Sequence, residues 1–120
     1  MGEVFFKGSV VKIGANAKDF KEENMLIFFR EDAPAYLADF CYLIRPEEGN
    51  YSFSVGNRLV LDDVEYPITA IGDVAITNFK ALGHLTVNFD GASEAAQPGT
   101  MHVKGEYPVI SENTRVSIVS

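Results

Sequence analysis

Short β-prone segments, each closed by a turn residue, recur along the whole chain and restrict it to a fold built mainly from strands. Met25–Arg30 is a continuous apolar run of strand length, which predicts a central strand buried on both sides. The expected strands are Val4–Ile13, Met25–Arg30, Cys41–Arg45, Arg58–Leu61, Val64–Ile71, one beginning at His84, one carrying His102, and Arg115–Val119, with Tyr51–Val55 as a possible edge strand.

Turn residues set the expected ends of these strands. Gly14 ends the first and Pro46 ends Cys41–Arg45, while Asp62-Asp63 forms a two-residue hairpin turn. Pro67 lacks an N–H donor, so its part of the ladder should face an edge or a bulge.

Two short helices are expected between the strands. Asp32 should cap a helix over Pro34–Phe40, which would bury Leu37, Phe40 and Cys41. Asp73 should cap a second helix that runs through Leu82 and ends at Gly83. Asn16 is a candidate cap for a shorter turn that would hold Phe20 inward.

The predicted fold class is mainly all-β: a small closed β-barrel of about seven strands with one or two short helices, or a sandwich of the same elements. Closing the barrel removes exposed strand edges, and the first and last strands are candidates to pair. A chain of 120 residues is expected to form one domain over 1–120.

Composition excludes several classes of function. A net charge of −7 with scattered basic residues argues against nucleic-acid binding. No apolar run approaches the roughly 20 residues that a membrane span needs, and the first residues lack the plan of a signal peptide. The single Cys41 suits a reducing cytosol. We therefore expect a cytoplasmic protein without direct membrane insertion.

The chain has only two histidines, and both are expected on neighbouring strands that follow glycine turns. Alternation places His84 on one face with Thr86, Asn88 and Asp90, and places His102 on one face with Thr100 and Lys104. If the two strands pair, both imidazoles lie on the polar face of one small sheet. A neutral imidazole is a good nucleophile and proton carrier near pH 7.

Other interpretations of these residues remain open. Two partly exposed strand histidines need no function, and His84, His102 and Asp90 are also a weak zinc ligand set. Cys41 is expected to fill the core, and hairpin-turn chemistry explains Asp62 and Asp63. No glycine-rich phosphate loop or serine nucleophile motif is present in the sequence.

The motifs resemble the IIA component of the glucitol/sorbitol-specific phosphotransferase system. The resemblance covers about Gly14 to Gly105 and rests on blocks that keep their order and spacing. They are Ile13-Gly14-Ala15, Met25 through Pro34, Tyr66-Pro67-Ile68-Thr69-Ala70-Ile71-Gly72, Leu82-Gly83-His84-Leu85-Thr86, Phe89-Asp90-Gly91 and Pro98-Gly99-Thr100-Met101-His102-Val103.

The resemblance implies a closed β-barrel in the cytoplasm that relays phosphoryl groups without a cofactor. Its partners would be the carrier protein HPr and the IIB and IIC parts of the sorbitol transporter. In the implied alignment the accepting histidine of the family falls on Ile44, which cannot carry phosphate. His84 and His102 are then the candidate acceptors. We expect the acceptor to be His84, which shares its face with Thr86 and Asn88. The positive charge of Lys104 would instead favour a phosphate on His102. The negative end of the helix before Gly83 opposes this choice. The alternative is a non-catalytic binding or regulatory module on the same fold.

Overall fold

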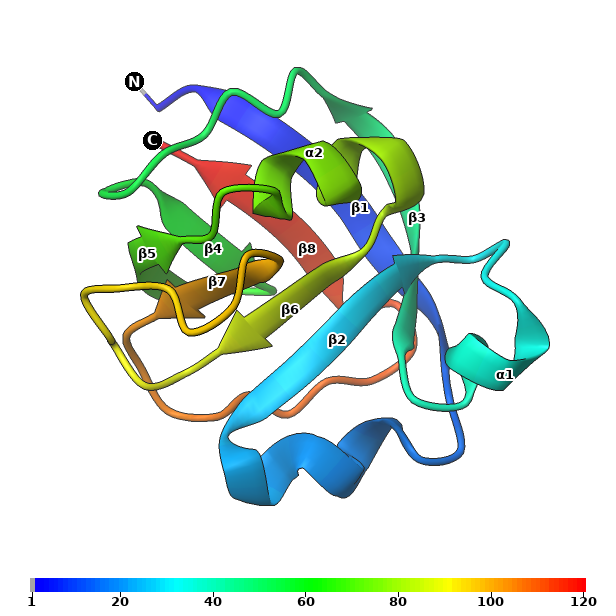
Figure 1. The fold of residues 1–120 in the computed structure, drawn as a ribbon. Coiled ribbons are helices and arrows are strands. Elements are labelled where there is room, and N and C mark those ends of the chain that lie inside the picture. Colours follow the sequence, from blue (N-terminus) through cyan, green and yellow to red (C-terminus); the bar gives the residue numbers. More distant parts are fainter. Residues whose placement is uncertain (1) are drawn as a thin grey trace.

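The computed structural model, which describes residues 2–120, is a closed barrel of eight strands with short helices outside it (Figure 1). The prediction of a mainly β closed barrel is therefore confirmed. Around the barrel the order is β1-β3-β2-β6-β7-β5-β4-β8. The strands are β1 (Val4–Ile13), β2 (Met25–Arg30), β3 (Tyr42–Gly49), β4 (Arg58–Leu61), β5 (Val64–Ile71), β6 (Leu85–Asn88), β7 (Thr100–Val103) and β8 (Arg115–Val119).

The first and last strands pair and close the barrel, as expected. β1 is antiparallel to β8, with Val4 opposite Val119 and Ser9 opposite Arg115, and its other edge pairs with β3. Two pairs are parallel, β2 with β3 and β6 with β7. β4 and β5 form the predicted hairpin, and a bulge between Ile68 and Ala70 follows directly after Pro67.

Two strand predictions are wrong around the third strand. Pro46 does not end β3, which continues to Gly49. β2 pairs with β3 only up to Arg30 and Ile44. Beyond that point β3 has no β2 neighbour, so the missing N–H of Pro46 leaves no hydrogen bond to β2 unmade. Tyr51–Val55 is not a strand, because Tyr51 adopts a positive φ of 59° and leaves the extended path.

The two α-helices are shorter than predicted, and no side chain caps a helix in the part of the chain that the structure describes. The elements are the 3-10 helix η1 (Ala17–Glu23), α1 (Ala35–Ala38) and α2 (Ala75–Leu82). Asp32 is not a cap, because its carboxylate accepts from Arg30 Nε at 3.2 Å. Val74, rather than Asp73, occupies the N-cap of α2. Gly83 ends α2 in the left-handed conformation, as predicted.

α1 does not bury the residues expected of it. Leu37 and Phe40 are 36% and 41% exposed, and only Cys41 of that set is buried. A helix of four residues is too short to turn a continuous apolar face toward the barrel. Phe20 likewise stays partly exposed and packs on Phe40, with ring centroids 6.3 Å apart.

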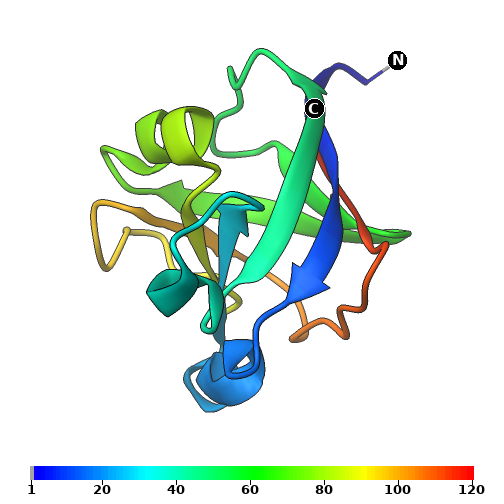
Figure 2. The ribbon, with the colours of Figure 1, turned by 90° about the vertical axis from the view of Figure 1, so that its right-hand side faces the viewer.

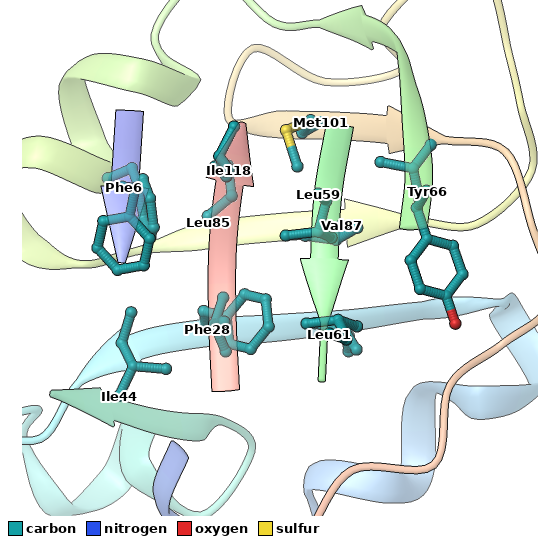
Figure 3. Close-up of a cluster of buried hydrophobic side chains, with 14 of the residues drawn as sticks. Phe6, Phe28, Ile44, Leu59, Leu61, Tyr66, Leu85, Val87, Met101 and Ile118 are labelled. Carbon is teal, nitrogen blue, oxygen red and sulfur yellow. The ribbon is translucent and has the colours of Figure 1, made fainter. Parts of the chain in front are cut away.

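Alternate residues of the strands fill the barrel with a continuous apolar core (Figure 3). Phe6 contacts Phe79 of α2 at a centroid distance of 4.6 Å, so this helix closes one end of the core. A smaller cluster of Phe29, Cys41 and Leu43 packs outside the main core, together with residues that include Ile27, Ala33 and Ala38. Across the described residues, no helix combines the length and apolar character needed to cross a bilayer.

Candidate functional site

His84 is positioned by the end of α2 and by the strand opposite it. Its backbone N–H donates to Asn78 O at 3.4 Å, and the chain then enters β6. β6 is antiparallel to β2 with Phe28 opposite Leu85, which brings Phe29 beside His84. The two rings stack with centroids 5.1 Å apart and planes inclined by 24°. The imidazole is thus held by an aromatic surface.

The ring nitrogens of His84 are available for chemistry. Burial lowers the pKa of His84 below its ordinary value, because a charged imidazolium loses solvation against apolar neighbours. Within residues 2–120, the buried side-chain nitrogen and oxygen atoms without a hydrogen-bond partner are limited to Asn88 Oδ1. No residue of the described part of the chain makes a hydrogen bond to the ring of His84, and the ring is partly exposed, so its nitrogens reach solvent. His84 is therefore a neutral imidazole with a free lone pair at pH 7.

His102 occupies a different environment, because its side chain is only 1% exposed. Its Nδ1 lies 2.7 Å from Asp90 Oδ1, and the backbone N–H of Ala96 donates to its Nε2 at 3.0 Å. These partners assign a neutral tautomer with the proton on Nδ1, donated to the carboxylate. Both ring nitrogens are therefore occupied beneath the loop that carries Ala96.

Asp90 fixes both the ring of His102 and the start of the covering loop. Its Oδ1 accepts the N–H of Ala92 at 3.0 Å in addition to the contact with His102. Burial acts to raise the pKa of Asp90, but the hydrogen bonds from His102 and Ala92 outweigh it and leave that pKa below its ordinary value. Asp90 is therefore an ionised partner that orients the imidazole.

The two predicted site histidines come from neighbouring parts of the sheet, since His84 directly precedes β6 and His102 lies in β7. β6 and β7 are parallel, with Thr86 opposite Thr100 and Asn88 opposite His102. His84 precedes Asn88 by four positions, which is about 13 Å along a strand. Alternation places both side chains on the outer face of the sheet, where His84 meets Phe29 and the loop covers His102.

Ile44 lies in the barrel core. Its side chain is fully buried, and it lies opposite Val10 of β1 and Arg30 of β2. Figure 3 shows it directed toward the cluster that contains Phe6 and Phe28. A side chain at this position is inaccessible to a phosphoryl donor in this structure.

The other candidates from the sequence have structural roles here. Cys41 is 3% exposed in the smaller cluster, and burial raises the pKa of its thiol to about 11. Asp62 adopts a positive φ of 54° in the hairpin turn, and its Oδ1 accepts the N–H of Arg115 at 3.0 Å. Among residues 2–120, no three His, Cys, Asp or Glu side chains converge to hold a metal ion.

Two residues that shape these environments have no signal in the sequence. Phe29 stacks on His84 only because β2 pairs with β6, which lies far along the chain. Ala96 contributes a backbone N–H to His102 from an irregular loop. Neither contact follows from a local pattern of residues.

Comparison with known proteins identifies relatives of the whole barrel. The family model described as the PTS system glucitol/sorbitol-specific IIA component matches residues 5–117. The glucitol/sorbitol-specific EIIA components of Shigella flexneri and of Escherichia coli K12 are each 42% identical over 105 residues. These matches span 88% of this chain and 85% of each relative.

A solved structure has the same fold. The crystal structure of a PTS system IIA component from Enterococcus faecalis V583 superposes with a TM-score of 0.78 at 24% sequence identity. The match covers 92% of this chain and 96% of that chain. The two proteins therefore share nearly the complete barrel.

Proposed function

The chain belongs to the glucitol/sorbitol-specific IIA components of the sugar phosphotransferase system, and from this membership we propose that it relays phosphoryl groups. In this proposal, residues 1–120 act as one IIA domain in the cytoplasm. The domain accepts a phosphoryl group from HPr on a histidine and passes it to the IIB component of a transporter that also contains IIC. The transfer needs no cofactor on this chain.

We propose His84 as the acceptor, and its free ring nitrogens carry the proposal. His84 is partly exposed, and its depressed pKa keeps the imidazole neutral and nucleophilic. The two ring nitrogens of His102 are instead hydrogen-bonded to Asp90 and to the backbone N–H of Ala96, and the ring is buried. Phosphorylation of His102 would first require the covering loop to move.

The proposed step is an exchange between two imidazoles. A lone pair on a ring nitrogen of His84 attacks the phosphorus of phosphohistidine on HPr. A new N–P bond forms while the N–P bond of the donor breaks, and the electron pair returns to the donor ring. Phe29 fixes the plane of the attacking ring, and positioning of this kind supplies much of the rate in phosphoryl transfer.

The test is phosphorylation in a reconstituted system of phosphoenolpyruvate, enzyme I and HPr, read as an acid-labile mass increase of one phosphate. We expect His84→Ala to take up no label, while His102→Gln, which keeps hydrogen-bonding groups under the loop, remains labelled. Folding of both variants is checked by amide NMR spectra. Label lost in His102→Gln and kept in His84→Ala would refute the choice of His84.

The burial of Ile44 supports a second candidate function, a non-catalytic binding module of the same system. The family acceptor position inferred from the resemblance holds a core residue here. If wild type binds HPr but takes up no label while a IIA protein with the histidine does, the relay fails for this chain and the binding role replaces it.

A further inference from the structure

A groove of about 480 Å³ lies between the β4–β5 hairpin and the segment that follows β7. One wall contains Leu61 and Val64 of the hairpin, and the other contains Pro108 and Val109. Val64 and Val109 are 55% and 96% exposed, although both are aliphatic. The groove thus presents apolar edges to solvent on both sides.

Aromatic packing fixes two of the residues that line the groove, Tyr66 and Tyr107. Tyr66, Phe89 and Tyr107 form a row of edge-to-face contacts, with centroid distances of 5.1 and 5.4 Å. The Tyr107 hydroxyl donates to Met25 O at 3.0 Å. The backbone of Gly105 lies so close to Tyr66 that a Cβ there would be 2.6 Å from Cδ1 of the ring. The groove is therefore already formed before any partner binds.

The charge of the lining residues has one sign. Asp62, Glu65 and Glu106 line the groove, and none of its lining residues is basic. Glu65 is paired with Arg58, whose Nη1 lies 2.5 Å from its carboxylate. Glu106 has no ion-pair partner among residues 2–120. Burial raises the pKa of the Tyr66 phenol, and the negative charge of Glu106 raises it further.

These features select one class of occupant. A second copy of the chain would bring the same carboxylates and a further charge of −7, and like charges at an interface oppose association. We propose that this groove docks a basic protein segment whose aliphatic side chain packs between Val64 and Val109 while its lysine or arginine residues face Asp62 and Glu106.

The docking surface is separate from the proposed relay site. Figure 2 shows the tip of the β4–β5 hairpin on the opposite side of the barrel from α1. His84 lies at the α2–β6 junction and stacks on Phe29, and neither residue lines the groove. A segment bound in the groove would leave His84 open to a phosphoryl donor, so the proposal goes beyond the relay and does not depend on it.

The test is an amide NMR titration of the full chain with the synthetic peptide Lys-Lys-Leu-Val-Lys-Lys. We expect saturable shifts confined to Leu61–Tyr66 and Gly105–Val109. Two control peptides separate the contributions: Lys-Lys-Gly-Gly-Lys-Lys keeps the charge, and Glu-Glu-Leu-Val-Glu-Glu keeps the apolar pair. Both should bind more weakly than the first peptide, because each lacks one of the two complementary features.

Surface substitutions then locate the contact. Val109→Ser should weaken binding of the first peptide about three- to tenfold, because aliphatic contact is lost. Glu106→Gln should weaken it about two- to fivefold. The matched controls Val55→Ser and Glu48→Gln change exposed residues outside the groove and should leave affinity unchanged.

Three results would overturn the proposal. The first is binding of the glycine peptide as tight as that of the first peptide, which would show attraction by charge alone. The second is the absence of saturable shifts in the groove. The third is self-association of the protein with shifts at these amides without peptide, which would assign the groove to a second copy. The His84→Ala variant should bind the first peptide as wild type does, so failure of the relay leaves this result interpretable.

Discussion

At the scale of single residues, the environment of His84 predicts its titration. Burial lowers the pKa of His84, so we expect its ring signals in an NMR pH titration to have a midpoint below the ordinary histidine value of about 6.5. The unfolded chain then binds a proton more readily than the folded chain. The free energy of unfolding should therefore decrease as the pH falls from about 6.5 to the folded midpoint.

The matched variant for this prediction is His84→Gln, which cannot titrate. As the pH falls across the same interval, the free energy of unfolding of wild type, measured in urea, should decrease relative to that of the variant. A midpoint at or above the ordinary histidine value would contradict burial as the dominant influence on this ring.

A second prediction at this scale concerns Ile44. Ile44→His places a polar ring in a fully buried apolar site, and we expect the free energy of unfolding to fall by about 2–5 kcal/mol. Ile44→Val removes one methylene at the same site and should cost about 0.5–1.5 kcal/mol. Chemical denaturation measures both. A stable Ile44→His protein that takes up phosphate would show that the site can open.

The sequence predicts the positions of the two histidines along the chain better than it predicts their surroundings. Alternation along the strand identifies the outward positions of His84 and His102. The exposure of each ring depends on partners from elsewhere, Phe29 for His84 and the Ala96 amide for His102. Strand order and loop path decide such contacts, and a local pattern contains neither.

At the scale of elements, the connection between α2 and β6 depends on Gly83. Its φ is +70°, and a Cβ at this position would lie 2.7 Å from the backbone nitrogen of Arg30. Gly83→Ala should lower the free energy of unfolding by about 2–4 kcal/mol, from the left-handed conformation and the clash together. Thermal and urea unfolding monitored by circular dichroism measure the loss.

Gly56 provides the control for this substitution. Its φ is also positive, at +98°, but an added Cβ would meet no atom within 4 Å. Gly56→Ala should therefore cost only about 1–2 kcal/mol of backbone strain. Equal losses in the two variants would remove the close approach to Arg30 as a cause.

Strand boundaries follow the sequence where apolar pattern and turn chemistry agree, as in Met25–Arg30 and the hairpin around Asp62-Asp63. They depart from it where pairing overrides a local rule. Pro46 remains inside β3 because β2 has already ended beside it. The missing N–H of a proline interrupts a sheet only where a neighbour requires it.

At the scale of the whole molecule, we expect net charge to control the rate of encounter with the proposed carrier, HPr. We expect HPr to meet this chain, whose charge is −7, with a basic surface, so the two proteins should associate more tightly at low salt, where long-range attraction accelerates encounter. We expect the dissociation constant to rise about fivefold or more between about 20 and 300 mM salt.

NMR titration at both salt concentrations measures this dependence, and the shifted amides should form one compact patch that includes His84. The variant Glu48→Gln changes the net charge by one unit at an exposed residue of β3 and should alter affinity only slightly. An affinity independent of salt, or shifts scattered over the surface, would argue against charge-steered docking.

The pairing of β1 with β8 also determines when the barrel can be completed. One edge of β1 meets β3 early, but its other edge waits for Arg115–Val119 at the opposite end of the chain. During synthesis that edge stays open until the ribosome has released β8. We therefore expect closure to be a late step, because it joins distant parts of the chain, and we expect it to slow folding. The time before closure is the period when the nascent chain is most exposed to wrong strand partners.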